Sequence, residues 1–132
     1  MPSIFSKIVA GDIPSYKIAE NEHFLAFLDA FPLTRGHALV IPKKEVDYIF
    51  DLDTDTYREL LLFASEVAKA MKKAINCKRI SMHVVGLEVP HAHVHLIPIN
   101  STNDCNFANA KLQFSKEEFE RIAQSIREQM FN

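Results

Sequence analysis

Histidines and apolar residues alternate in the run His91-Ala92-His93-Val94-His95-Leu96-Ile97. Side chains of a β-strand point alternately to the two faces of its sheet. A strand over residues 91–98 would therefore place the three histidines on one face and Ala92, Val94 and Leu96 on the other. The pattern predicts a strand that borders an apolar core on one side and presents a row of imidazoles on the other.

Strand-like runs of residues flank this stretch, at 16–20, 24–28, 37–41 and 80–85. A long helix is predicted from residue 54 to about 75, because apolar residues recur there at three- and four-residue steps. Strands and helices do not alternate strictly along the chain. We therefore expect an α+β fold, an antiparallel sheet with the long helix and a C-terminal helix packed on it.

Two serines are placed to begin further helices. Ser3 can cap a short helix that ends before Gly11, and Ser115, with Glu118 three residues later, can cap a helix over about 115–129. The length of 132 residues suits one domain spanning residues 1–132.

Composition narrows the classes of partner. The formal net charge is −2, and no basic run is long enough to form a nucleic-acid-binding stripe. No apolar stretch approaches the roughly 18 residues that span a bilayer, and the N-terminal residues lack the apolar segment of a signal peptide. Cys77 and Cys105 lie in no metal-binding spacing. We expect a cytoplasmic protein with reduced thiols and no nucleic-acid or membrane partner.

The three neighbouring histidines fit two chemistries. A metal site could use two of them, but His91 and His95 lie roughly 13 Å apart along a strand, so one ion cannot take all three. The further ligands would come from elsewhere, and His37 and His83 are available. Alternatively the middle residue, His93, is a nucleophile, because a neutral imidazole attacks well and its flanking histidines can orient it. The third hypothesis is that the strand is partly exposed and merely happens to be rich in histidine.

The same run matches the His-φ-His-φ-His-φ-φ signature of the histidine-triad (HIT) family, where φ is apolar. Further segments are similar to that family in the same order: Ile4-Phe5-Ser6-Lys7-Ile8 with Gly11-Asp12-Ile13-Pro14, Phe24 to Asp29, and Gly36-His37-Ala38-Leu39-Val40-Ile41-Pro42-Lys43. Together they span residues 3–98, and the chain most resembles the small phosphoramidase-like members.

The resemblance implies a nucleotide hydrolase or nucleotidyl transferase. Nothing in the sequence demands a metal, and we expect no cofactor. His93 would attack phosphorus and become nucleotidylated, His95 would contact the phosphate, and His91 and His37 would support them. Asp29 would bind ribose hydroxyls of a purine nucleotide, although a turn-capping role is also open to it. The resemblance further implies a homodimer. The remaining pocket positions would be Ile4, Phe5, Ile8, Phe27 and Leu28, each of which could instead be core.

One segment departs from the family pattern. Many members carry Gly-Gln-[Ser/Thr] before the triad, whereas this chain has Leu87 and Glu88 after Gly86. A carboxylate beside a phosphate site repels anions, so we expect Glu88 to alter substrate choice, unless it is merely solvated. The leading interpretation is hydrolysis of nucleoside 5′-phosphoramidates or related phosphoanhydrides. The alternatives are a dinucleoside polyphosphate hydrolase, a nucleotide-binding regulatory module with little turnover, and a metalloenzyme.

Overall fold

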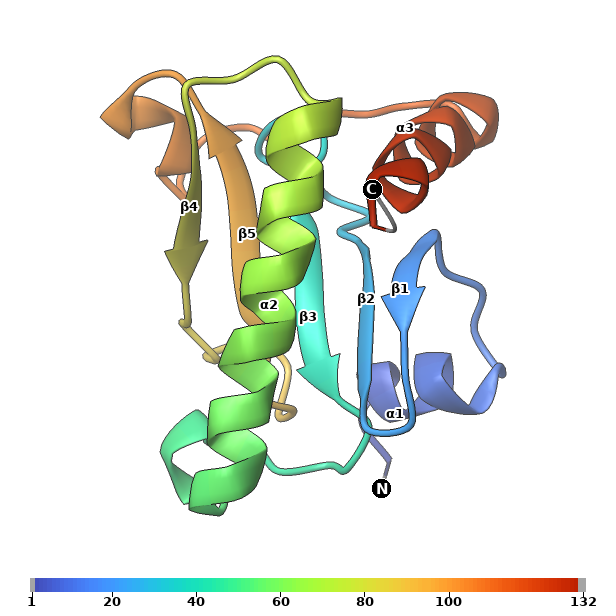
Figure 1. Cartoon of the computed structure of the whole chain (residues 1–132), viewed down its shortest axis with the longest axis vertical. Helices are drawn as coiled ribbons and strands as arrows, with labels where there is room; N and C mark the ends of the chain where they lie inside the picture. Colours follow the sequence, from blue (N-terminus) through green and yellow to red (C-terminus); the bar gives the residue numbers. More distant parts are fainter. Residues whose placement is uncertain (1, 131–132) are drawn as a thin grey trace.

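The computed structural model describes residues 2–130, and within them an antiparallel sheet of five strands is combined with three α-helices (Figure 1). The strand order is β1-β2-β3-β5-β4, and every neighbouring pair is antiparallel. The α+β fold expected from the sequence is confirmed. The elements are α1 (Ile4–Ala10), β1 (Lys17–Glu20), β2 (Phe24–Leu28), β3 (Ala38–Pro42), the 3-10 helix η1 (Ile49–Asp51), α2 (Thr54–Ala74), β4 (Arg79–His83), β5 (Val94–Ile99), the 3-10 helix η2 (Thr102–Cys105) and α3 (Lys116–Gln129).

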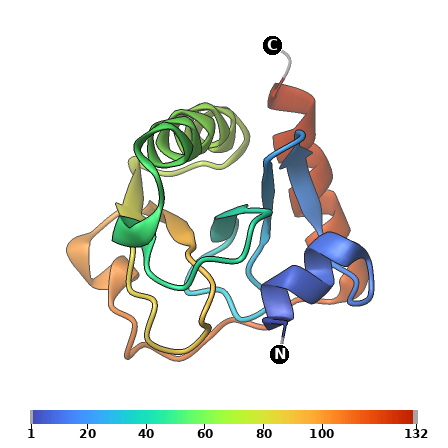
Figure 2. The same cartoon turned by 90° about the horizontal axis from the view of Figure 1, so that it is seen from below.

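Helices α2 and α3 share one apolar core with the sheet, whereas α1 lies on the opposite side of the sheet from α2 (Figure 2). The periodic residues of α2 form the buried side of that helix, as predicted. The two serine caps are also confirmed, because the Ser3 and Ser115 hydroxyls accept backbone N–H groups at the starts of α1 and α3. In the part of the chain that the structure describes, no helix is long and apolar enough to cross a membrane.

The loop before β3 depends on a glycine. Gly36 has a φ of +91°, and a Cβ atom added there would lie 3.0 Å from Cγ1 of Ile75. Any other residue would be strained in this backbone conformation and would also press on the chain that leaves α2. Gly36 thus lets the chain turn tightly and deliver His37 to the sheet.

The predicted strand over residues 91–98 is shorter at its N-terminal end than expected. The pairing with β3 begins only at Val94, while the Ala92 N–H donates to the Val46 carbonyl (2.7 Å) and the His91 N–H to the Val89 carbonyl (2.8 Å). The backbone N–H groups of His91 and Ala92 are therefore bonded to loop residues instead of a neighbouring strand. The strand expected at 80–85 likewise ends at His83, where its pairing with β5 stops.

The alternation of side chains survives this change. Ala92, Val94 and Leu96 all belong to the core shared with α2 and α3. The opposite face carries the histidines and a second apolar cluster, which α1 covers. The site is therefore built on the face of the sheet away from the long helix.

Candidate active site

Four histidines are buried on this face. His37, His91, His93 and His95 are only 2%, 0%, 6% and 9% exposed. His37 lies immediately before β3 and His95 lies on β5, while His91 and His93 lie in the extended segment leading to it. Buried imidazoles require hydrogen-bond partners, and those partners determine which ring nitrogen carries the proton.

The tautomer of His93 follows from a backbone contact. Its Nδ1 lies 2.7 Å from the carbonyl oxygen of His91. Because a carbonyl can only accept, Nδ1 carries the proton, and in the neutral ring Nε2 keeps its lone pair. The Phe5 ring packs edge-on against His93, with the ring centroids 5.0 Å apart. The His93 ring is therefore fixed in orientation, and its Nε2 is the nitrogen with a free lone pair, as a nucleophile would require.

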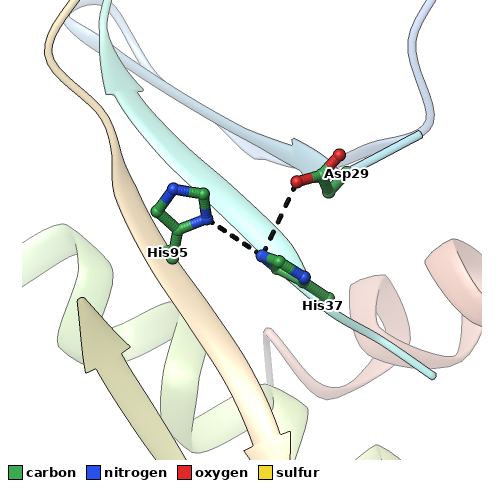
Figure 3. Close-up of side chains that lie close together, drawn as sticks. All are labelled: Asp29, His37 and His95. Atoms are coloured by element: carbon green, nitrogen blue, oxygen red, sulfur yellow. Dashed lines mark hydrogen bonds and ion pairs between the residues drawn. The ribbon is translucent and has the colours of Figure 1, made fainter. Parts of the chain in front are cut away.

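A second chain of bonds fixes His37 and His95 (Figure 3). The Leu33 N–H donates to Nδ1 of His37 (3.0 Å), so Nε2 of His37 carries the proton and donates to Nδ1 of His95 (3.0 Å). The neutral His95 ring then has its proton on Nε2, the nitrogen that points away from His37. His95 is thus a hydrogen-bond donor on the face where His93 offers a lone pair.

Burial keeps both rings of this chain neutral. Loss of solvation lowers the pKa of His37 to about 3, and the nearby His95 contributes to the shift. The same cause, together with the charge on His93, lowers the pKa of His95 to about 4. At neutral pH the Leu33–His37–His95 chain is uncharged, in agreement with the tautomers deduced from the hydrogen bonds.

His91 is tied to the start of α1 by a network that the sequence did not reveal. Its Nε2 donates to the Pro42 carbonyl (2.8 Å), and its Nδ1 accepts from the Ser3 hydroxyl (2.8 Å). The Glu45 carboxylate accepts the Ser3 backbone N–H and the Ser6 hydroxyl, both at 2.6 Å. These bonds, that from Ser6 first, lower the pKa of Glu45 to about 2.

The partners of His91 are distant in sequence, so no local motif connects them. Ser3 shows only a helix-capping signal in the sequence, and Glu45 shows none. Since His91 carries the carbonyl that orients His93, the network reaches His93 through the backbone.

Asp29 follows β2 and lies beside this chain. Its Oδ1 accepts the Phe31 N–H (2.9 Å), which is the turn contact, and its Oδ2 lies 3.6 Å from Nε2 of His37. Burial raises the pKa of Asp29. The turn contact occupies one carboxylate oxygen, and the second oxygen faces the histidine side.

Asp29, His37 and His95 could also hold a metal ion, because their ligand atoms lie within 4.8 Å of one another. The Nε2 of His37 is, however, protonated while Leu33 donates to its Nδ1. A metal would require His37 to change tautomer and lose that backbone bond. The arrangement as it stands suits a hydrogen-bond chain better than a metal centre.

The expected pocket residues divide between the two faces of the sheet. Phe5, Ile8 and Phe27 pack in the cluster covered by α1, and Ile4 is 49% exposed at its edge. Leu28 corrects the expectation, since its side chain packs in the core beneath α2 and α3. The reason is strand alternation, which turns Leu28 away from the face that Phe27 occupies.

Glu88 lies exposed in the loop before the triad, and its charge contributes to the raised pKa of Asp29. Two rings that were not expected at the site also border it. His83 lies opposite His95 in the sheet, and Phe107 contacts both rings. The sequence offered His83 only as a possible metal ligand and gave no signal for Phe107.

A family model described as the HIT domain matches residues 10–102. The chain belongs to the HIT family. This confirms the resemblance drawn from the triad and from the Gly36-His37 segment. The family places the chain among nucleotide hydrolases and transferases.

Individual HIT proteins agree in sequence and in fold. The protein hit of Bacillus subtilis is 34% identical over 131 residues, covering 93% of this chain and 90% of the relative. The adenosine 5′-monophosphoramidase of Schizosaccharomyces pombe is 39% identical over 99 residues, covering 74% of each chain. A crystal structure of a Hit-like protein from Bartonella henselae has a TM-score of 0.83 at 31% identity, covering 96% of this chain and 95% of that one.

Proposed function

We propose that this chain hydrolyses nucleoside 5′-phosphoramidates or related phosphoanhydrides through a covalent nucleotidyl-His93 intermediate. The observation that carries the proposal is the bond from His93 Nδ1 to the His91 carbonyl, which leaves Nε2 free to attack. The Nε2–H of His95 is the donor for a phosphoryl oxygen. The similarity to an adenosine 5′-monophosphoramidase supports the leaving group assigned to the substrate.

The reaction has two displacements at phosphorus. In the first, the Nε2 lone pair of His93 forms a bond to phosphorus, and the bond from phosphorus to the leaving group breaks with its electron pair. An amine leaving group takes a proton from solvent. In the second, water bonds to phosphorus, the P–N bond breaks with its pair returning to Nε2, and a proton passes to solvent. His95 stabilises the charge on the phosphoryl oxygens in both steps.

The nucleoside part is assigned to the α1 side of the face. Phe5, Ile8 and Phe27 offer buried apolar surface for a purine, with Ile4 at the edge. Asp29 would accept hydrogen bonds from the ribose hydroxyls through the oxygen that does not bind Phe31.

We place this protein in the cytoplasm as a homodimer, and sedimentation of the purified chain would test the dimer.

Trapping of the intermediate tests the proposal. Wild-type protein, His93→Ala and His23→Ala are mixed with adenosine 5′-phosphoramidate labelled on phosphorus and quenched in alkaline detergent. We expect label on the wild type and on His23→Ala, which loses an exposed histidine, and none on His93→Ala. Acid should release the label, because a phosphoramidate bond is acid-labile. Tight nucleotide binding without label or product would instead indicate a regulatory binding module.

A further inference from the structure

The first histidine of the triad, His91, is held by a short stretch of chain, residues 42–46, where β3 ends. The Pro42 carbonyl accepts from Nε2 of His91 (2.8 Å), and the Val46 carbonyl accepts from the N–H of Ala92 (2.7 Å). Because Nε2 of the neutral ring carries the proton, Nδ1 can only accept a hydrogen bond. The position of the His91 ring therefore also depends on the donor that faces Nδ1.

Two serine hydroxyls lie within hydrogen-bonding distance of this nitrogen. The Oγ of Ser3 lies 2.8 Å from Nδ1 of His91, and the Oγ of Ser6 lies 3.5 Å from it. Each hydroxyl has a single proton, so the serine that does not donate to His91 must send its proton elsewhere. The Ser6 proton has a second acceptor within reach, which is the Glu45 carboxylate at 2.6 Å.

Glu45 determines which serine donates to His91. Its Oε1 accepts both the Ser6 hydroxyl and the Ser3 backbone N–H, each at 2.6 Å. A carboxylate at this distance is a stronger acceptor than a neutral ring nitrogen at 3.5 Å, so the Ser6 proton goes to Glu45. The bond from the Ser3 N–H at the same time fixes the residue whose hydroxyl faces His91. Glu45 thus selects Ser3 as the donor and holds it in place.

The position of His91 is passed on to His93. The His91 carbonyl accepts from Nδ1 of His93 (2.7 Å), so Nε2 of His93 keeps the lone pair. Phe5, which α1 carries between the two serines, packs edge-on against both rings, with centroid distances of 5.8 and 5.0 Å. A displacement at the start of α1 would therefore move both the acceptor and the ring neighbour of His93. Small misplacements of a reacting group lower its rate strongly.

We propose that Glu45 is a positioning residue for the reaction at His93. It acts through Ser3 and Ser6 on the ring of His91. The His91 carbonyl then sets the direction of the His93 lone pair. The inference rests on the proposed function, in which that lone pair attacks phosphorus. Glu45 itself takes no part in bond making.

Four variants test the role of Glu45: Glu45→Ala, Glu45→Gln, Ser3→Ala and the double variant Ser3→Ala/Glu45→Ala. The kcat and KM values of each are measured with adenosine 5′-phosphoramidate. Glu20→Ala is the matched control. Glu20 also binds residues 42–46, through Lys43 (2.7 Å), but within residues 2–130 its carboxylate makes no hydrogen bond to the two serines.

We expect kcat to fall about threefold to tenfold in Glu45→Ala and KM to change less than about twofold, because the lone pair of His93 is misdirected while the apolar surface of α1 remains. Glu45→Gln should keep kcat within about twofold of wild type, since both bonds go to Oε1 and an amide oxygen can accept them. The double variant should lose no more activity than the more impaired single variant, because Glu45 acts through Ser3. Glu20→Ala should match wild type.

Three kinetic outcomes would overturn the inference. Losses that multiply in the double variant would show that Glu45 acts independently of Ser3. Equal losses in Glu45→Gln and Glu45→Ala would show that the charge matters and the two hydrogen bonds do not. An unchanged kcat in Glu45→Ala would show that Glu45 does not position the site.

Nitrogen-15 NMR of histidine-labelled protein separates this inference from the proposed function, because it reports which ring nitrogen carries a proton without any substrate. We expect His93 to be protonated at Nδ1 alone in wild type and in Glu45→Gln, and to exchange between two tautomers in Glu45→Ala. A single, unchanged tautomer in Glu45→Ala would overturn the inference. Absence of trapped label on wild-type His93 would instead refute the proposed function, whereas the tautomers would still decide whether Glu45 orients His93.

Discussion

The two faces of residues 91–96 are both buried but are stabilised in different ways. Ala92, Val94 and Leu96 are at most 2% exposed and pack against apolar side chains beneath α2 and α3. The histidines on the other face are held by hydrogen bonds to backbone groups, serine and one another. The first face contributes stability through burial. The hydrogen bonds of the second face determine which ring nitrogens carry protons, and therefore which can donate a hydrogen bond and which can offer a lone pair.

The largest effect is expected when the proposed nucleophile, His93, is removed. We expect His93→Ala to lower kcat/KM at least ~10⁴-fold, because no other group supplies the attacking lone pair. The free energy of unfolding should fall by only about 1–2 kcal/mol, since one hydrogen bond to the His91 carbonyl is lost. Steady-state kinetics and urea denaturation measure the two quantities. A loss of stability large enough to explain the inactivity would show that the faces are not separable.

The matching substitution is made on the apolar face, which packs beneath α2 and α3. Leu96→Ala removes a fully buried side chain from beneath α2 and should lower the free energy of unfolding by about 2–5 kcal/mol. The folded fraction should still form the nucleotidyl-His93 intermediate, because no hydrogen bond of the site involves the Leu96 side chain. Urea denaturation and trapping with labelled substrate check both parts. Loss of labelling in protein that is demonstrably folded would contradict the separation.

Lowering the pH should reduce the free energy of unfolding through the histidine face. The pKa of His37 is lowered to about 3 and that of His95 to about 4. An unfolded chain takes up these protons near pH 6.5. Below about pH 6.5 the unfolded state therefore binds more protons, and the free energy of unfolding falls as the pH falls, by about 1.4 kcal/mol per pH unit for each group. Above about pH 6.5 this contribution is complete.

Urea denaturation at several pH values between about 7 and 4.5 measures this slope. Asp29, whose pKa is raised by burial, acts in the opposite direction toward the acid end of the window. Stability that is flat or rises as the pH drops from about 6.5 would contradict neutral, buried His37 and His95.

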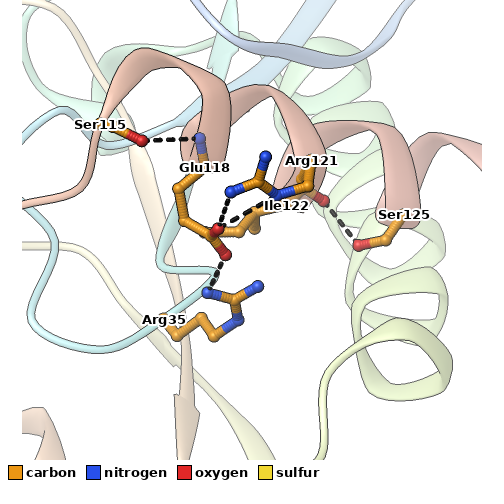
Figure 4. Close-up of polar contacts among 6 residues, drawn as sticks. All are labelled: Arg35, Ser115, Glu118, Arg121, Ile122 and Ser125. Carbon is orange, nitrogen blue, oxygen red and sulfur yellow. Dashed lines mark hydrogen bonds and ion pairs between the residues drawn. The ribbon is translucent and has the colours of Figure 1, made fainter.

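Two capping serines allow a matched comparison. Ser3 caps α1 and also donates to His91, whereas Ser115 caps α3, where the Glu118 carboxylate binds Arg35 and Arg121 (Figure 4). Each serine-to-alanine change should cost about 1 kcal/mol of stability through the lost cap. Only Ser3→Ala should also lower kcat, by about threefold to tenfold, because the acceptor nitrogen of His91 loses its partner. Equal kcat values in the two variants would show that the Ser3–His91 bond has no role in orienting His93.

The smallest effect is expected at Glu88. Its side chain is exposed, so Glu88→Gln should change the ratio of phosphoramidate to dinucleotide turnover by about twofold to threefold, through loss of charge alone. Steady-state kinetics with both substrates at low and high salt measure the change. An unaltered ratio at low salt would leave Glu88 as a solvated residue without influence on substrate choice.

The amino-acid sequence by itself determined the α-helices, the approximate positions of the strands and the alternation of side chains between two faces over residues 91–97. Period-two alternation, the period of α2 and the capping serines depend on neighbouring residues, so they can be read locally. The Gly36-His37 pair and the triad also indicated the family. Leu28 shows why a pocket position carried over from a family must also be assigned to a face of the sheet. Strand alternation turns the Leu28 side chain into the core.

Only the tertiary structure decided which nitrogen of each histidine carries its proton. Those positions depend on the carbonyls of Pro42 and His91, the Leu33 N–H and the Ser3 hydroxyl. Several of these groups lie far from the triad in sequence, and backbone donors and acceptors have no residue-specific signature. The pairing of β5 with β3, which begins only at Val94, and the contact between Phe107 and His83 also depend on the tertiary structure. They arise from packing between residues far apart in the sequence, which local sequence patterns do not reveal.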